Sequence, residues 1–421
     1  MRIAAVATRR HEDDGHLRRK MSEHATPRKR RPAGDEDHVV RVCRNPAEID
    51  AAAWDALVAA QPSSTPFMTM AYLRALHASN SAVERTGWAP HFLLLEHGGE
   101  LVAACPLYLK DHSYGEYVFD WAWADAYRRH GLDYYPKLLD AVPFTPVSGP
   151  RLLARSPEHR LVLLRAIEEL ARSAGLSSAH LLFLDDADRA AARDAGWSLR
   201  TTVQFHWTNR TEKPYVDFAE FLASLQRDKR KKIQQEQRRV ANAGIRFSAA
   251  TGDAITTADW EFFYRCYTLT YRAHHSTPYL TRDFFARMLT TMGENWLLFV
   301  ARRGERPIAT SLIAIDPVRK AAFGRYWGAV EHVSCLHFDA CYYQPLAWCI
   351  ANGYLRFEGG AQGEHKMARG LMPVQTWSAH WLAHPQFARA VDDFLAREGK
   401  GVESYLDELG ERDPFKSAGP R

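Results

Sequence analysis

Residues 93–100 read Leu-Leu-Leu-Glu-His-Gly-Gly-Glu, and residues 298–305 read Leu-Phe-Val-Ala-Arg-Arg-Gly-Glu. In both stretches an apolar run ends in a charged turn that contains glycine, and a second apolar run follows at 102–109 or 308–315. Apolar runs of strand length on both sides of such a turn predict a β-hairpin. The sequence therefore predicts one hairpin in each half of the chain.

Other blocks of sequence recur in the same order as the two hairpins. The paired blocks are 53–57 with 259–263, 65–69 with 277–281, and 134–136 with 342–345. Together with the hairpins they make four matches at a nearly constant spacing, which favours a tandem duplication. The predicted parts are a disordered basic tail (1–38), a first domain (39–205), a second domain (206–395) and a C-terminal extension (396–421).

Each predicted domain shows the same order of expected elements. Two helices precede the hairpin, and an aromatic strand, a helix and a further strand follow it. The expected positions are aromatic strands at 117–123 and 322–327, helices at 132–141 and 339–352, and strands at 143–153 and 354–358. This order predicts an α+β (α/β) unit with a mixed central sheet flanked by helices, present twice.

Composition limits the class of protein and its compartment. The 421 residues are 46% apolar and 25% charged, which is typical of a globular chain, and a net charge of +5 is too small for a general polyanion binder. The six cysteines form no CxxC pair and no regular framework, which favours reduced thiols and a cytoplasmic location. No signal peptide or transmembrane segment is expected.

Three long motifs carry a family resemblance. They are SYGEYVFDWAWADAY at 113–127, PFTPVSGPR at 143–151 and FEGGAQGEHK at 357–366. With the duplicated units, they resemble a widespread bacterial family of predicted N-acyltransferases. This family lies in the FemAB-like branch of the GNAT acyltransferase fold, which includes the peptidoglycan-bridge Fem ligases. The resemblance covers about residues 42–395. It implies tandem GNAT-like domains around a shared cleft, and transfer of an acyl or aminoacyl group to an amine.

The resemblance also bears on the co-substrate. GNAT enzymes that use acetyl-CoA usually hold its pyrophosphate on a Q/R-x-x-G-x-G/A loop at a helix N-terminus. The nearest segment, 325–330, ends in valine and lies on an expected strand. This departure disfavours acetyl-CoA and leaves aminoacyl-tRNA or a longer acyl-CoA as the co-substrate, with no tightly bound cofactor.

Residues 112–125 concentrate acids, aromatic residues and a histidine. Transfer to an amine needs a group that takes up the amine proton, so Asp120, Asp125 and His112 are candidate catalytic residues. On a strand, Asp120 would leave the aromatic face and point toward a cleft or solvent. The alternative is an aromatic core strand with flanking solvated acids. The expected substrate-binding residues here are Tyr114, Glu116, Tyr117, Trp121 and Trp123.

The glycine-rich segment 358–366 follows an expected strand. Its glycines let the backbone approach a ligand closely and expose N–H donors, and Lys366 could neutralise a phosphate or carboxylate. In Fem-like enzymes a lysine resembles Lys366 in position. The candidate catalytic residues are Glu358, His365 and Lys366, and the candidate substrate-binding residues are Gln362 and Gly363. A plain surface loop is the alternative.

A basic run at 227–239 continues an expected amphipathic helix, so one helix face would be strongly positive. The candidate anion-binding residues are Lys229, Arg230, Lys231 and Lys232. The possible partners are a tRNA, an anionic lipid-linked substrate or a membrane surface. A solvated charged helix is the alternative.

The cysteines and histidine between 335 and 349 do not have the spacing of a metal site, and we expect no metal. His337 and Asp339 precede the second expected helix and are candidate substrate-binding residues, with helix capping by Asp339 as the alternative. Arg325 and Tyr326, on the second expected aromatic strand, complete the substrate-binding set.

The sequence therefore predicts a cytoplasmic N-acyltransferase. Its acceptor would be an amine on a small molecule, a peptide or a cell-envelope precursor. The alternative is a non-catalytic recognition module that binds an RNA, a lipid or a peptidoglycan fragment. The oligomeric state, the donor and the catalytic half are left open.

Overall fold

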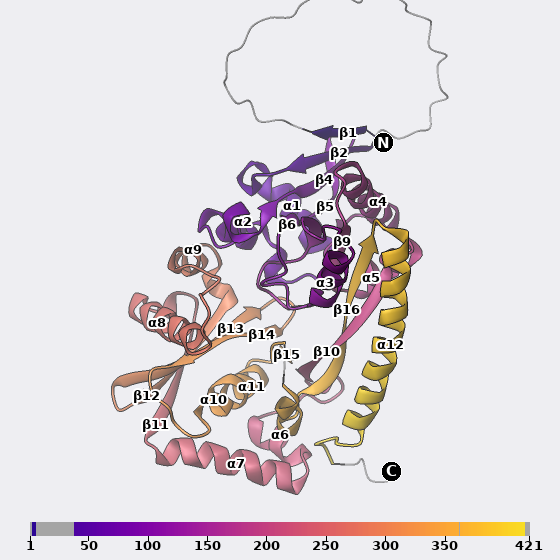
Figure 1. The fold of residues 1–421 in the computed structure, drawn as a ribbon. Coiled ribbons are helices and arrows are strands. Elements are labelled where there is room, and N and C mark those ends of the chain that lie inside the picture. Colours follow the sequence, from indigo (N-terminus) through magenta and orange to yellow (C-terminus); the bar gives the residue numbers. More distant parts are fainter. Residues whose placement is uncertain (1, 6–37, 362, 417–421) are drawn as a thin grey trace, which may run out of the picture.

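The computed structural model describes residues 2–5, 38–361 and 363–416, and it contains two sheets (Figure 1). A five-stranded sheet has the order β1-β2-β4-β5-β8, and an eleven-stranded sheet has the order β11-β12-β13-β14-β15-β10-β16-β9-β7-β6-β3. The strands are β1 Arg2–Ala5, β2 His38–Cys43, β3 Ala89–Pro90, β4 Phe92–His97, β5 Glu100–Cys105, β6 Leu107–Lys110, β7 Lys137–Asp140, β8 Leu153–Ala154, β9 Ser178–Leu184, β10 Ser198–Thr208, β11 Ile245–Thr251, β12 Trp296–Arg303, β13 Arg306–Asp316, β14 Ala321–Ala329, β15 Arg356–Glu358 and β16 Met372–Leu382.

Helices cover both sheets. The α-helices are α1 Ala51–Ala60, α2 Met70–Ala78, α3 Trp121–Arg129, α4 Pro157–Ser173, α5 Asp186–Asp194, α6 Phe218–Ser224, α7 Arg227–Asn242, α8 Thr257–Ala273, α9 Arg282–Met292, α10 Leu336–Phe338, α11 Gln344–Ala351 and α12 Pro385–Gly410. A π-helical turn, Asp339–Tyr343, joins α10 to α11.

Both predicted hairpins are confirmed, as β4–β5 and β12–β13. The strand expected at 102–109 is divided, because Pro106 has no N–H to donate to a sheet. Its first part is β5 in the smaller sheet, and its second part is β6 in the larger one.

Three expectations for the first half are wrong. Residues 117–123 do not form a strand, because α3 begins at Trp121. The helix expected at 132–141 is replaced by β7, whose four buried residues pair with β6 and β9. Between 143 and 153, where a strand was expected, only the short β8 begins. In this segment, pairing with strands distant in sequence, together with prolines that have no N–H to donate, therefore decides the secondary structure against the local sequence pattern.

In the second half the expected aromatic strand is β14, the expected helix is the π-helical turn with α11, and the last expected strand is β15. β14 and β15 are parallel neighbours, but they pair only over Ala321–Phe323. The pairing ends there because β15 ends at Glu358, while β14 continues to Ala329. The expected basic helix is α7, separated from α6 at 225–226.

Strands of the two halves of the chain pair with each other in the larger sheet. β10, which crosses the predicted boundary at 205/206, pairs with β15 and β16, and β16 pairs with β9 of the first half. α12 packs on β10 and β16 and lies beside both (Figure 1). The division into domains stays a prediction. Most of the tail lies outside the described residues, but Arg2–Ala5 pair with β2.

Candidate functional site

The connection between β6 and β7 is held by a buried ion-pair cluster. The Lys137 ammonium lies 2.8 Å from Glu116 Oε2 and 2.5 Å from Asp120 Oδ2, and all three side chains are buried. Ser113 Oγ donates to Asp120 Oδ1 at 2.6 Å. The expectation that Asp120 points to a cleft or solvent is therefore wrong, because the residue precedes a helix and faces the interior.

The charges of this cluster shape its pKa values. Burial acts to raise the pKa of Asp120, but the Lys137 ammonium outweighs it, so the pKa lies below its usual value. Burial raises the pKa of Glu116 to about 7 despite Lys137. Asp120 therefore stays ionised over the physiological range, and the geometry favours an anchoring role over that of a proton acceptor.

Two buried histidines extend the cluster across β9 and β16. His180 Nδ1 and His380 Nδ1 are 2.8 Å apart, and burial lowers the pKa of both, for His180 to about 3. Since both rings are neutral, one Nδ1 donates and the other accepts. The Tyr134 hydroxyl donates to Asp120 at 2.6 Å and lies 3.1 Å from His180 Nε2. These hydrogen bonds join the β6–β7 connection to β9 in the first half of the chain and to β16 in the second half.

The other predicted residues of 112–125 have different surroundings. Asp125 is exposed and forms ion pairs with Arg128 and Arg129 on α3. Trp123 is buried with its ring centroid 4.8 Å from that of His380. His112, Tyr114 and Trp121 lie at the surface or near it, with Tyr114 and Trp121 exposed.

Arg325, Tyr326 and Tyr117 meet where the two halves touch. β14 has an irregularity in its register with β13 at this point, between the residues that face Gly324 and Tyr326. The Arg325 guanidinium donates to Phe144 O at 2.8 Å and lies 5.1 Å from the Tyr326 ring centroid. Tyr117 packs beside the same core of aromatic residues. Three predicted substrate-binding residues therefore lie together, although much of their surface is used in packing.

Lys366 lies against the glycines that follow the end of β15. It is 3% exposed, and its Nζ donates to Gly360 O at 2.9 Å. No carboxylate in the described part of the chain forms an ion pair with it, and burial lowers its pKa to about 8. A cation in this setting is poorly compensated, which is energetically costly unless a negative charge arrives.

A second layer of residues supports Lys366. Arg369 pairs with Glu236 of α7 at 3.1 Å, and the Tyr343 hydroxyl donates to the same carboxylate. Tyr342 OH lies 3.2 Å from His365 Nε2. Glu236 was not among the residues predicted from the sequence. Its burial could have been inferred, because Glu236 shares one face of α7 with the apolar residues Ile233 and Val240 at helical spacing.

His337 and Asp339 lie on the same helical segment. The His337 ring centroid is 5.8 Å from that of Tyr342, and burial lowers the pKa of His337 to about 4. Burial raises the pKa of Asp339 to about 6, and its carboxylate accepts from Gln344 at 3.0 Å. π-Helical turns are rare in proteins, and those that occur are often found at functional sites. His337 and His365 are brought together around Tyr342.

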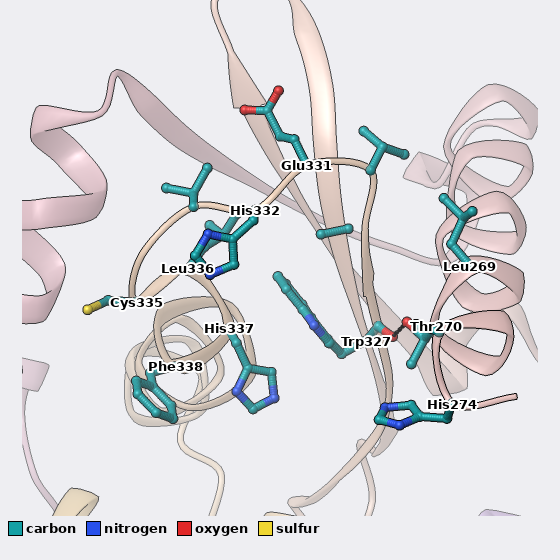
Figure 2. A pocket seen from close by; sticks show the side chains of 14 residues that line it. Leu269, Thr270, His274, Trp327, Glu331, His332, Cys335, Leu336, His337 and Phe338 are labelled. Carbon is teal, nitrogen blue, oxygen red and sulfur yellow. Dashed lines mark hydrogen bonds between the residues drawn. The ribbon is translucent and has the colours of Figure 1, made fainter.

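A pocket of about 680 Å³, named here the His337 pocket, opens at the end of β14. Figure 2 shows Trp327 projecting between the end of α8, which is followed by His274, and α10, which carries His337. α8 approaches β14 so closely that a Cβ at Gly328 would lie 2.2 Å from Cys266 O. Glycine is therefore required at 328 for this wall of the pocket to form.

A second pocket of about 500 Å³, named here the β10 pocket, lies between Tyr117–Phe119, β10 and Ala361. Ala361 follows Gly360, whose carbonyl accepts from Lys366. The β10 pocket therefore lies beside the glycine that Lys366 contacts. The His337 pocket reaches Phe338, whose ring centroid is 5.7 Å from that of His365, the residue before Lys366.

The remaining predicted residues of the glycine-rich segment are divided. Glu358 is buried in a separate pocket with His206, whose Nε2 is 3.8 Å away, so it does not face Lys366. Gly363 has a φ of +115°, and a Cβ there would lie 2.5 Å from the His365 ring. Gln362 lies outside the described residues.

The basic face of α7 is exposed. Lys231 and Lys232 point to solvent, and Lys229 pairs with Asp228 at 3.0 Å. Within residues 2–5, 38–361 and 363–416 no group of three or more histidines, cysteines or acids could hold a metal ion. Among the described helices none is long and apolar enough to cross a membrane.

Comparisons with known proteins give the family and the fold. The FemAB-like family, described as peptidoglycan biosynthesis/recognition, matches residues 45–417. No curated protein sequence matches the chain. The crystal structure of FemX gives a TM-score of 0.51 at 10% identity, covering 82% of this chain and 99% of that chain.

Two further structures are similar. The C-terminal domain of a candidate lysylphosphatidylglycerol synthetase from Agrobacterium fabrum gives a TM-score of 0.50 at 14% identity, covering 84% of this chain and 96% of that one. A tandem GNAT protein from the clavulanic acid biosynthesis pathway gives 0.43 at 14% identity, with 83% and 99% covered. The predicted α+β fold is confirmed by the sheets and helices of the chain and by its likeness to FemX and the synthetase domain. With the family matched over most of its length, the chain belongs to the FemAB-like family.

Proposed function

We propose that the chain is an N-acyltransferase whose reaction takes place around Lys366, just beyond the end of β15. The observation that carries the proposal is the Lys366 ammonium, which is buried and has no carboxylate partner within the described residues. A positive charge fixed in a site that excludes water stabilises negative charge more than it would in solvent. Lys366 is therefore suited to an oxyanion or another anionic group.

In the proposed reaction an acceptor amine attacks the carbonyl carbon of an acyl or aminoacyl donor. The new C–N bond forms while the C–S or C–O bond to the carrier breaks. The amine gives up one proton, and the carrier leaves as a thiol or hydroxyl. Lys366 would donate to the carbonyl oxygen as negative charge develops there. The two pockets would hold the two reactants in line, which supplies much of the rate.

The two pockets suggest how the reactants are divided. The His337 pocket is the larger of the two and is lined by Trp327 and His337, and we assign it to the donor. The β10 pocket lies between the halves and suits the acceptor. The donor is acyl-CoA or aminoacyl-tRNA, and the acceptor is an amine on a small molecule, a peptide or a cell-envelope precursor.

A titration of the purified protein with CoA and acyl-CoA esters tests the donor class. A ligand at about 100 times its dissociation constant stabilises the folded state by about 2.7 kcal/mol, which is a visible rise in the thermal midpoint. Trp327→Ala should abolish the rise, because the indole lines the His337 pocket. The exposed Lys400→Ala variant serves as the control. No rise with any CoA ester would turn the proposal to aminoacyl-tRNA.

For an aminoacyl-tRNA donor, α7 supplies the test. Each phosphate contact from a lysine adds about one unit to the slope of log affinity against log salt. The double variant Lys231→Ala/Lys232→Ala should therefore bind tRNA more weakly, with a slope smaller by about two. The matched control is Lys213→Ala/Lys400→Ala, which removes two exposed lysines elsewhere. Equal slopes for both double variants would remove α7 from the binding surface.

The recognition module remains the alternative function. It predicts binding of a peptidoglycan fragment or an RNA without any amide product. Single-turnover assays with both donor classes decide between the two, because the transferase must form a product that depends on Lys366.

A further inference from the structure

A third pocket, of about 680 Å³, lies beside the end of β15 and shares no lining residue with the His337 and β10 pockets. We call it the Glu358 pocket. Two motifs that the sequence singled out meet in its walls, because Ser148 and Gly149 come from segment 143–151 and Glu358 comes from segment 357–366. The proposed reaction at Lys366 uses none of these three residues.

Two oxygen atoms in the walls of this pocket are buried and have no hydrogen-bond partner among the described residues. They are Glu358 Oε2, in a residue that is only 3% exposed, and Ser148 Oγ. Arg356 Nε lies 3.3 Å from the other carboxylate oxygen, Glu358 Oε1. His206 Nε2 is 3.8 Å from Oε2, which is too far for a hydrogen bond, and lies 3.1 Å from Gln204 Oε1 instead. Buried polar atoms without partners are uncommon, so two of them in one pocket indicate that a ligand supplies the partner.

The ligand group that meets Glu358 must be a hydrogen-bond donor, because an ionised carboxylate accepts hydrogen bonds and cannot donate them. The buried guanidinium of Arg151 is near enough to interact with this carboxylate, but it does not supply the bond. Its three nitrogens donate to backbone carbonyls, those of Leu182, Pro150 and Val147. A charged N–H group forms a shorter and stronger hydrogen bond with a carboxylate than a neutral donor does. A cationic N–H donor is therefore the group that suits Glu358 Oε2 best.

The side chains that line the pocket carry more negative than positive charge. Three of them are acidic and two are basic: Asp185, Asp186, Glu358, Arg189 and Arg356. Arg189 forms an ion pair with Asp186 at 3.1 Å, and Arg356 pairs with Glu358. Asp185 forms no ion pair within the described residues, and its carboxylate accepts from the Ser63 hydroxyl and the Asp188 N–H instead. Burial lowers the pKa of His206, so its ring stays neutral near pH 7. Charge complementarity therefore favours a cation over an anion or a neutral group.

The same pocket has apolar walls beside its acids. Leu184, Val374 and Trp377 line it, and the Arg189 guanidinium lies 4.8 Å from the Trp377 ring centroid. Pockets for small molecules combine apolar walls with a few polar groups that fix the orientation of the ligand. The Glu358 pocket therefore suits a ligand with a charged end and a short apolar chain.

We propose that the Glu358 pocket binds a small organic cation, which carries a primary ammonium or guanidinium group on a short hydrocarbon chain. The N–H donors of the cation meet Glu358 Oε2, with Ser148 Oγ as a second acceptor, and the chain lies against the apolar walls. This site goes beyond the proposed function. Lys366 attracts negative charge and takes part in the transfer, whereas the Glu358 pocket attracts positive charge and holds its ligand without any reaction.

Calorimetric titration of the full chain near neutral pH, without any acyl donor, tests the pocket. The probes are n-butylammonium, n-butylguanidinium, n-butyltrimethylammonium and 1-pentanol. At least one of the first two should bind saturably, and the tighter of them identifies the head group. The trimethylammonium probe keeps the charge but has no N–H, and 1-pentanol has a donor but no charge. Each of these two should therefore bind about tenfold more weakly or worse.

Variants of the pocket locate the binding. Glu358→Gln should weaken binding of the N–H cation by about tenfold or more, and Ser148→Ala should weaken it by about threefold. The matched control is Glu403→Gln, an exposed acid on α12, which should bind within about twofold of the wild type. Ser148→Ala removes a hydroxyl that bonds nothing else in the described chain, so this variant should fold normally and decides the test if Glu358→Gln is unstable.

Three outcomes would overturn the proposal. They are absence of saturable binding of either N–H cation up to ~10 mM, unchanged affinity in the folded pocket variants, and equal affinity for the N–H cations and for the trimethylammonium or pentanol probe. Because no acyl donor is present, none of these outcomes depends on amide formation. If the cation binds but no amide forms in any assay, the proposed function fails while the Glu358 pocket stands.

Discussion

Lys366→Met is expected to stabilise the protein and to abolish amide formation. Burial lowers the pKa of Lys366 from 10.5 to about 8, so the folded state pays for holding the ammonium form. At about 1.4 kcal/mol per pKa unit, its removal gains up to ~3 kcal/mol at pH 7. The lost bond to Gly360 O reduces this gain by about 1 kcal/mol. The expected net effect is a thermal midpoint higher by a few degrees.

The pH dependence of the stability provides a test of this prediction. The unfolded chain binds the proton more tightly, so the stability of the wild type should rise with pH between about 8 and 10.5, as the penalty disappears. The advantage of Lys366→Met should be full at pH 7 and should shrink over that window. Thermal melts across the range, with Lys400→Met as the exposed control, measure this. A variant that is less stable than the wild type yet forms product would make Lys366 a structural residue.

The repeated hairpins could be predicted because each depends on neighbours in the sequence. An apolar run, a turn with glycine and a second apolar run are sufficient to specify β4–β5 and β12–β13. β14 and the helical segment that includes α11 followed from the same kind of local pattern. The family resemblance supplied the tandem arrangement.

The β6–β7 connection could not be predicted, because its structure depends on partners that are distant in sequence. An aromatic run at 117–123 reads as a strand, but Asp120 is fixed by Lys137, and Trp123 packs on His380 of β16. The buried partners His180 and His380 are 200 residues apart. No local period reveals such a pair.

The candidate site was predictable in part. His337 and His365 were chosen from two separate motifs, and the structure brings both against Tyr342. Glu358 was chosen with Lys366 because it is near in sequence. A strand alternates its side chains, so the residue before the glycines lies on the other side of the sheet, beside His206.

Asp120→Ala is expected to destabilise the protein by about 3–5 kcal/mol, because the buried Lys137 would lose one of its two carboxylate partners and the Ser113 and Tyr134 hydroxyls would lose their acceptor. Asp125→Ala, in the same segment, removes only an exposed carboxylate and should cost no more than about 0.5 kcal/mol. Chemical denaturation of the two variants beside the wild type measures the difference. Product formation by Asp120→Ala, measured where it is still folded, separates the anchoring role from that of a catalytic base.

The partner substitution tests the same cluster from its other side. Lys137→Met leaves Glu116 and Asp120 without their shared cation, and Asp120→Asn/Lys137→Met removes both members of one ion pair. The double variant should be less destabilised than the sum of its two single variants, since each single change strands a charge that the double change does not. Because the pKa of Asp120 lies below its usual 3.8, the stability that the Lys137–Asp120 pair gives the wild type should persist at neutral pH. It should be lost only as the pH falls below about 4. Additive effects of the two single changes would mean that Lys137 and Asp120 do not act as a pair.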